Sequence, residues 1–220
     1  RARHAEISLL AALSACANVT KTVSNVEWNW PQSFGGLFSA LSGQRINNEQ
    51  SVLLSSLSYL NLKGCILMGQ DLRQANLKGT DLTGADLSNA NLSGANLRDL
   101  LLEDVNLSKT NLQGADLRNT VLKGVNLSEA TLRGASLDST SMKNVNLFEA
   151  NLRGASLRNA TLKNVNLSEA NLREANLRNS SLQDVNLAGA DCQRSELEGI
   201  DWINVNVNGT NLNLTELTAM

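Results

Sequence analysis

Residues 123–142 read KGVNLSEATLRGASLDSTSM, residues 143–162 read KNVNLFEANLRGASLRNATL, and residues 163–182 read KNVNLSEANLREANLRNSSL. These segments are near copies of one another with a period of 20 residues, and each divides into four units of five residues. Self-similarity at a fixed period is typical of a solenoid, in which each repeat contacts only its neighbours. The sequence therefore predicts one coil per 20 residues, with position i stacked on position i+20.

The five-residue unit extends outward from this stretch, from Leu57 to Leu217, without an insertion or deletion. Of its 33 central positions 29 are Leu, and the others are Met142, Cys192, Trp202 and Val207. The residue two places before the central one is small or β-branched, and the two residues after it are polar or Gly. A period of five fits neither an α-helix nor a flat strand. We expect the Leu and the small residue to point inward, and the polar residues and Gly to form the turns.

The tandem unit A-(D/N)-L-x-x resembles the pentapeptide-repeat family over residues 57–217. The resemblance implies an all-β solenoid, a right-handed quadrilateral parallel β-helix of about eight 20-residue coils. Paired parallel strands lie about 4.7–4.9 Å apart, so the rod would be on the order of 40 Å long. The family often has Phe at the central position, and because none is present there in this chain, we expect a more uniform core. Such proteins are especially abundant in cyanobacteria.

Residues 1–56 lie outside the repeat, and we predict that they form an α-helical N-terminal cap on a β-helix of residues 57–220. Helical patterns occupy residues 4–19, 31–43 and 51–60, the second with Pro31 at its start and Gly43 at its end. A cap is needed because the open end of a solenoid exposes apolar core and unpaired strand edges. Five of the seven aromatic residues precede residue 60 and are expected to cover this end: Trp28, Trp30, Phe34, Phe38 and Tyr59.

The cysteines bear on location. Leu13-Ser14-Ala15-Cys16 matches the cleavage pattern of bacterial lipoproteins, which would give an exported protein with a lipid anchor on Cys16. The alternative is a cap helix with a buried cysteine, and Glu6 and the short apolar run favour it. Only Cys16 and Cys65 could form a disulfide, because Cys192 lies more than six coils away from Cys65. Three cysteines without a spacing pattern favour a reducing compartment, so we predict a cytoplasmic protein. We also expect no transmembrane segment.

Catalytic and metal-binding motifs are missing from the sequence. His4 is the only histidine, which excludes a Ser-His-Asp or Cys-His arrangement within the repeat. No Cys/His cluster has metal-ligand spacing, and each Gly is a single corner residue instead of part of a phosphate-binding loop. We predict neither an enzyme nor a cofactor. The net charge of −2 argues against direct binding of nucleic acid, for which a basic protein is expected.

The residues that follow each central Leu are expected to point outward and to form columns along the rod. We take two columns as the candidate surface for a partner: Lys123, Lys143 and Lys163, and Arg133, Arg153 and Arg173. A Glu column runs near them (Glu129, Glu149, Glu169), so a solvated face of salt bridges is the alternative interpretation. A further column, directly before the central position, is expected to form a structural ladder of amides: Asn106, Asn126, Asn146, Asn166, Asn186 and Asn206.

These observations predict a non-catalytic interaction scaffold that binds an unknown protein partner. The resemblance implies a second hypothesis, because some members of the family protect DNA gyrase from quinolones by imitating the DNA duplex. Such mimicry requires a strongly acidic rod, whereas residues 117–183 carry nine Lys and Arg against five Asp and Glu. A third hypothesis is that the chain is the repeat tail of a larger signalling protein.

Overall fold

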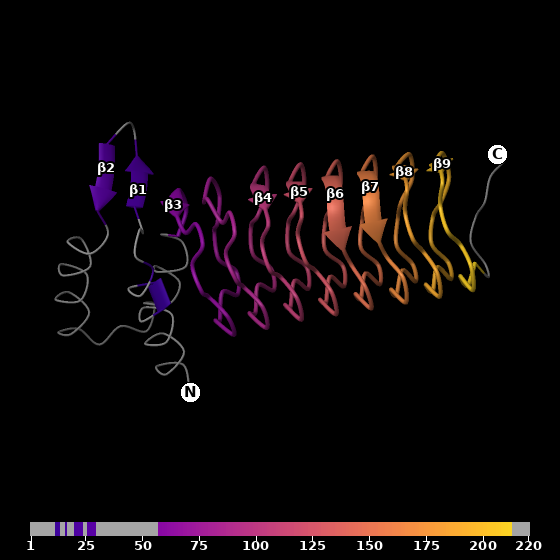
Figure 1. The fold of residues 1–220 in the computed structure, drawn as a ribbon, viewed down its shortest axis with the longest axis horizontal. Helices are drawn as coiled ribbons and strands as arrows, with labels where there is room; N and C mark the ends of the chain where they lie inside the picture. Colours follow the sequence, from indigo (N-terminus) through magenta and orange to yellow (C-terminus); the bar gives the residue numbers. More distant parts are fainter. Residues whose placement is uncertain (1–11, 14–15, 17–19, 24–25, 30–56, 213–220) are drawn as a thin grey trace.

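The computed structural model describes residues 12–13, 16, 20–23, 26–29 and 57–212. Residues 57–212 form a solenoid whose coils follow one another along a single axis in sequence order (Figure 1). The predicted all-β solenoid of parallel coils is therefore confirmed.

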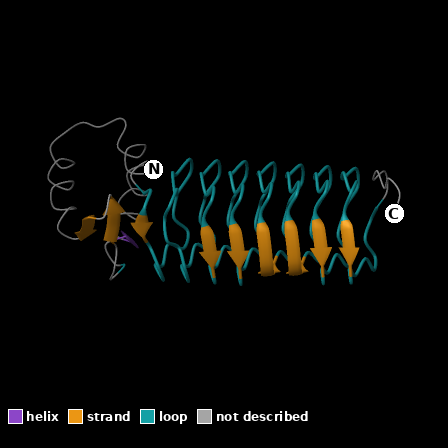
Figure 2. Cartoon of the chain, turned by 90° about the horizontal axis from the view of Figure 1, so that it is seen from above, coloured by secondary structure: helices purple, strands orange, loops and turns teal. Residues whose placement is uncertain are grey.

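One side of the solenoid is a continuous parallel sheet (Figure 2). Its strands, in spatial order, are β4 (Leu101–Glu103), β5 (Val121–Lys123), β6 (Ser141–Asn146), β7 (Thr161–Asn166), β8 (Ser181–Gln183) and β9 (Asp201–Ile203). Each residue pairs with the one 20 positions later, as Lys123 does with Lys143. Isolated parallel bridges with the same spacing extend from Asn61↔Asp81 to Asp191↔Asn211. The 20-residue coil read from the sequence is thus the structural repeat.

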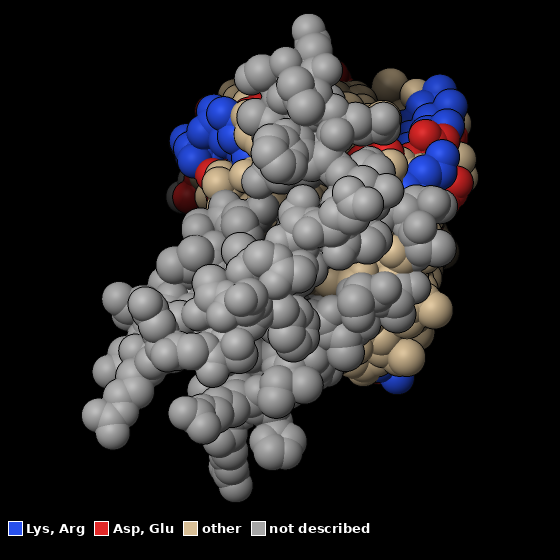
Figure 3. All heavy atoms as spheres, turned by 90° about the vertical axis from the view of Figure 1, so that its left-hand side faces the viewer, with Lys and Arg blue, Asp and Glu red and all other residues tan. Residues whose placement is uncertain are grey.

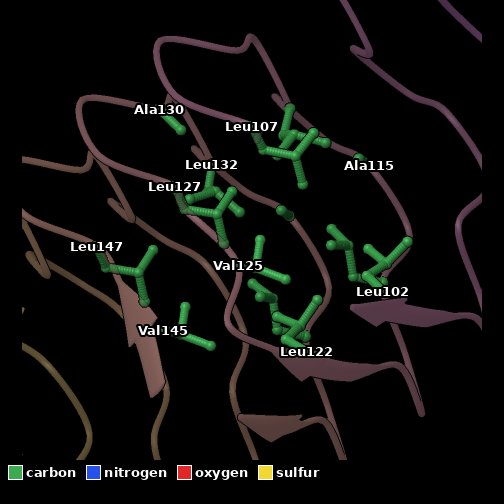
Figure 4. Packing of buried hydrophobic residues seen from close by; sticks show 14 of the residues in the cluster. Leu102, Leu107, Ala115, Leu122, Val125, Leu127, Ala130, Leu132, Val145 and Leu147 are labelled. Atoms are coloured by element: carbon green, nitrogen blue, oxygen red, sulfur yellow. The ribbon is translucent and has the colours of Figure 1, made fainter. Parts of the chain in front are cut away.

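The interior is filled by the central residue of each unit and by the small residue two places before it (Figure 4). Leu122, Leu127 and Leu132 are 0% exposed, and Met142 and Cys192 occupy the same position at 1%. Removing a leucine side chain from water contributes about 1.5–3 kcal/mol, so this regular burial is the main stabilising term. The last described coil is less well covered, because Val207, also a central residue, is 44% exposed.

The corners of the coil are left-handed turns. The second residue after each central position has a positive φ, between 53° and 70°, at every unit from Tyr59 to Gly209. At the corner after Leu72, the N–H of Ala75 donates to the carbonyl of Leu72 at 3.0 Å, which is the hydrogen bond of a type II turn. Only this position requires the left-handed conformation that Gly adopts without strain and that Asn and Asp tolerate. The prediction that Gly and polar residues form the corners is correct. The structure shows that the second of the two polar positions after the central residue turns the chain.

The asparagine ladder is present and extends over six coils. Each amide Nδ2 donates to the Oδ1 of the asparagine one coil earlier, at 2.9–3.5 Å between Asn206 and Asn106, and Asn106 donates to Asp86 at 3.0 Å. Each Oδ1 also accepts a backbone N–H two residues later, as Asn146 does from Phe148 at 3.2 Å. The column therefore links successive coils and also fixes the start of each following turn.

The N-terminal part shows an element that the sequence analysis missed. Strands β1 (Thr20–Val23) and β2 (Val26–Asn29) form an antiparallel hairpin, and β1 also pairs with β3 (Leu60–Asn61) at the start of the solenoid. Of the helix expected over residues 4–19, Ala12 and Leu13 are described and helical. The helix expected over residues 31–43, and the cap expected from Trp30, Phe34 and Phe38, lie outside the described residues. Of the helix expected over residues 51–60, residues 57–60 are described, and they form a turn and the start of β3 instead.

The ladder predicts a measurable loss of stability. Replacing Asn146 and Asn166 together by Val removes the ladder bonds at both rungs and the bonds to the N–H groups of Phe148 and Ser168. At about 1 kcal/mol for each of these lost hydrogen bonds, and about 2–4 °C per kcal/mol for a domain of this size, the melting temperature should fall by roughly 10–20 °C in thermal denaturation followed by circular dichroism.

The matched control for this experiment is the pair Ser141→Val and Thr161→Val. Both residues are exposed, also directly precede a central residue, and their hydroxyls make no hydrogen bond within the described part of the chain. The control should melt within about 2 °C of the wild type. An equal loss in both variants would show that valine, and not the missing amide, causes the change.

Candidate interaction surfaces

The coil has four sides of five residues, and each side carries its own column of outward residues. In chain order these are the strand side (β4–β9), the asparagine side (the Asn106–Asn206 column), the arginine side (Arg133, Arg153, Arg173) and the mixed side (Arg98, Arg118, Asp138, Arg158, Arg178). Figure 3, which looks along the rod from its N-terminal end, shows Lys and Arg gathered on two separate flanks.

The six candidate partner residues do not form one patch. Lys143 lies on the strand side, and Arg153 lies ten residues further along the coil, which is half of the 20-residue turn. The lysine and arginine columns therefore lie on opposite sides of the rod. The sequence analysis took both columns as the candidate surface, but a flat partner can contact only one of the two.

The lysine column is partly neutralised within the chain. Lys123 forms an ion pair with Glu103 of the preceding strand, and the hydrogen bond from its ammonium raises the pKa of Lys123. Lys143 and Lys163 are exposed, are register partners in β6 and β7, and form no ion pair with any described residue. Two adjacent positive charges thus remain available on this side.

The arginine column is also partly neutralised within the chain. The guanidinium of Arg153 contacts Glu174 at 3.1 Å, and that of Arg173 contacts Asp191 at 3.1 Å, whereas Arg133 has no ion pair among the described residues. The interpretation as a salt-bridged face therefore holds for part of each column. Exposed pairs of this kind contribute about 0–1 kcal/mol and can exchange for an external partner at little cost.

The mixed side is the most fully neutralised. Arg118 pairs with Asp116 at 2.6 Å, and Arg158 pairs with Asp138 of the preceding coil at 2.7 Å. The hydrogen bonds that Arg118 donates hold the pKa of Asp116 below its ordinary value. Arg178 contacts both Glu196 and Glu198 at 3.1 Å. This side offers little free charge to a partner.

The asparagine side carries features that sequence reasoning did not select. Phe148 is 37% exposed in a column where the neighbouring coils have Ser128 and Ser168. A shallow groove of about 410 Å³ follows the other edge of the same side and is lined by Asn144, Val145, Asn146, Asn164, Val165, Asn166, Asp184 and Asn186. Phe148 could have been noticed from its column alone, but the groove could not, because it depends on how three successive coils stack.

A disulfide joins the N-terminal part to the solenoid. Cys16 and Cys65 are bonded, with their Cα atoms 5.3 Å apart, and Leu13 beside them is 1% exposed in the core cluster. This is the one pair that the sequence allowed. The bond differs from the expectation of reduced cysteines. Cys192 is free and buried, and desolvation raises the pKa of its thiol to about 12.

Two observations concern metal sites and membranes. In residues 57–212 and the short described N-terminal stretches, no group of three or more His, Cys, Asp or Glu side chains is placed to hold a metal ion. No helix in the same part of the chain has the length and apolar character required to cross a bilayer.

Taken together, parallel coils of four five-residue sides with left-handed corners define a quadrilateral β-solenoid. The family model for pentapeptide repeats matches the chain in overlapping segments from residue 61 to residue 218. The chain therefore belongs to the pentapeptide-repeat family.

Two solved structures are similar to this chain. Full-length QnrB1, a plasmid-mediated fluoroquinolone resistance protein, is similar with a TM-score of 0.54 and 19% identity over 71% of this chain and 83% of QnrB1. HetL, a pentapeptide repeat protein involved in heterocyst differentiation regulation from the cyanobacterium Nostoc sp. strain PCC 7120, is 24% identical over 82% of this chain and 92% of HetL, with a TM-score of 0.30. A comparison with curated protein sequences gives no significant match.

The cysteines are expected to differ in their reaction with iodoacetamide. In the native, unreduced protein at about pH 8, none of the three should be alkylated, because two are bonded and Cys192 is buried with a raised pKa. After mild reduction, Cys16 and Cys65 should react, whereas Cys192 should react only after denaturation. Peptide mass spectrometry measures each site separately, and alkylation or a lipid adduct on Cys16 without reductant would contradict the disulfide.

Proposed function

We propose that this protein is a non-catalytic scaffold that binds a protein partner through its arginine side. The observation that carries the proposal is the strict repeat of Arg133, Arg153 and Arg173 at one guanidinium per coil. In the same units the central Leu and the small Ala are buried, and the residue after each Arg forms the turn. Membership of the pentapeptide-repeat family agrees with an interaction role. Arg is suited to this role because its planar guanidinium binds carboxylates with two parallel hydrogen bonds.

The spacing of the arginine column favours an acidic helix as the partner. Successive guanidinium groups are about 4.7–4.9 Å apart along the axis, as set by parallel strand pairing. Carboxylates at positions i and i+3 of an α-helix are separated by about 4.5 Å along its axis, and those at i and i+7 by about 10.5 Å, close to two coils. Same-face residues of an extended strand recur only every 6.4–6.8 Å or so, out of step with the coils. A helix lying along the rod can therefore match three arginines at once.

This proposal predicts specific binding of a model peptide. A helical peptide with Glu at i, i+3 and i+7 should bind the wild type measurably in fluorescence anisotropy at low salt. The triple variant Arg133→Glu, Arg153→Glu, Arg173→Glu should bind it at least tenfold more weakly, because three attractive contacts become repulsive. The affinity for the wild type should fall as salt rises.

Two controls make the test specific. The variant Arg98→Glu, Arg118→Glu, Arg178→Glu makes the same change of charge on the mixed side and should retain the wild-type affinity for the peptide. A peptide of the same composition with its Glu residues distributed around the helix should bind poorly to every variant. Equal loss in both triple variants would show that net charge, and not the arginine column, attracts the peptide.

The alternative function is modulation of DNA gyrase by imitation of DNA. It is supported by the likeness in fold to QnrB1, and by the acidic end of the chain, where residues 184–220 have six Asp and Glu against one Arg. The free Lys143 and Lys163 oppose it, since a DNA mimic presents negative charge along its length. We expect no inhibition of gyrase supercoiling at micromolar concentrations in an agarose-gel assay. Inhibition that an acidic-end variant (Asp191→Lys, Glu198→Lys) abolishes would favour the gyrase role instead.

The Cys16–Cys65 bond bears on the cellular location of the protein. Disulfides persist in oxidising compartments and are rare in the cytoplasm. The bond therefore supports the exported alternative over the cytoplasmic one, but without a lipid on Cys16, because the same sulfur cannot form both linkages. The alkylation pattern of the native protein, taken directly from its source, decides between these locations.

A further inference from the structure

The asparagine side carries one exposed aromatic side chain and a separate groove. Phe148 projects from the column that follows the central leucines, where Ser128 and Ser168 are its neighbours. The groove lies at the opposite edge of the same side, along Asn146 and Asn166 and the corner before them. Phe148 does not line this groove, so the side carries both a protruding ring and a separate depression.

The two edges of the asparagine side also carry opposite charges. Lys143 and Lys163 lie at the edge shared with the strand side, and Glu149 and Glu169 lie at the edge shared with the arginine side. All four side chains are exposed, and none forms an ion pair with another described residue. Protein interfaces are enriched in aromatic residues and pair opposite charges across the two partners. This side of the rod offers both, because it carries an exposed aromatic ring, a free basic edge and a free acidic edge.

We propose that this side binds a second copy of the chain, with the two rods parallel and related by a two-fold axis that runs along the rods between them. Rotation by 180° about such an axis exchanges the two edges. The lysine edge of each copy then faces the glutamate edge of the other, and Phe148 of each copy faces the groove of the other. A single contact is thereby made twice, as a closed two-fold interface requires.

The register of the charges selects this arrangement. Lys143 and Glu149 are six residues apart within one coil of 20 residues, and each coil rises about 4.8 Å along the axis. The two residues therefore differ in height along the axis by only about 1.4 Å. Opposed coils of a parallel pair therefore place each Lys beside a Glu, coil after coil. A two-fold axis across the rods would make them antiparallel and would place lysine opposite lysine, which repels.

The size of the surface sets the expected strength. A side roughly 10–15 Å wide on a rod about 40 Å long gives about 800–1,200 Å² of total buried area, at the lower limit for specific protein interfaces. The charge pairs lie at the rim, where they direct orientation more than affinity, and the ring of Phe148 lies against a groove lined mainly by asparagine amides. We expect a reversible dimer with a dissociation constant on the order of 10–100 μM.

Sedimentation velocity over a concentration series tests the proposal. The wild type should change from monomer to dimer across the range of about 1–500 μM, and Phe148→Ser should shift the dissociation constant at least tenfold upward. This variant should fold normally because Ser occupies the equivalent position in the adjacent coils. Phe148→Tyr, which retains the ring, should still dimerise.

Charge exchange provides the decisive comparison. The variant Lys143→Glu, Lys163→Glu and the variant Glu149→Lys, Glu169→Lys should each be monomeric alone, because both of their edges have one sign. Mixing the two variants should restore a one-to-one dimer, and so should the chain that carries all four substitutions. A monomeric wild type at 500 μM, or a dimer that neither Phe148→Ser nor the charge variants weaken, would overturn the proposal. Peptide binding by the arginine side is measured separately, so failure of either proposal leaves the other standing.

Discussion

The structure depends on parallel backbone pairing between residues 20 positions apart. The N–H of Leu127 donates to the carbonyl of Asn146 at 2.7 Å, and the N–H of Asn146 donates to the carbonyl of Val125 at 3.0 Å. This alternation continues from coil to coil and satisfies backbone groups that would otherwise be buried without partners. It also fixes the rise of each coil, and this rise determines the spacing of every column on the surface.

The same constraint creates a problem of like charges. Side chains 20 residues apart are held about 4.8 Å from each other, so a column of one sign repels itself. The chain offsets this repulsion in two ways. Uncharged columns use amide ladders, in which Asn donates to Asn, and charged columns place an acid in the adjacent coil, as Asp138 is placed beside Arg158. Where neither device is present, as at Lys143 and Lys163, the charge is left for something outside the chain.

Much of this could be predicted because a solenoid repeats local rules. The burial of the central leucines, the amide ladder and the parallel register follow from one five-residue unit, and each was predicted correctly. Two kinds of feature were not. The hairpin of β1 and β2 lies outside the repeat, where no period guides the assignment. The groove beside Asn146 could not be predicted either, because it depends on how three successive coils stack.

The sequence by itself determined the coil: its length, its register, its buried residues and the position of its turns, because each is dictated by sterics and burial within 20 residues. The tertiary structure decided which charges are neutralised, and that a groove shares one side with Phe148, a basic edge and an acidic edge. These properties depend on side chains from different coils and different sides meeting in space. Only the stacking of the coils brings these side chains together, and the pattern of the five-residue unit does not specify which of them meet.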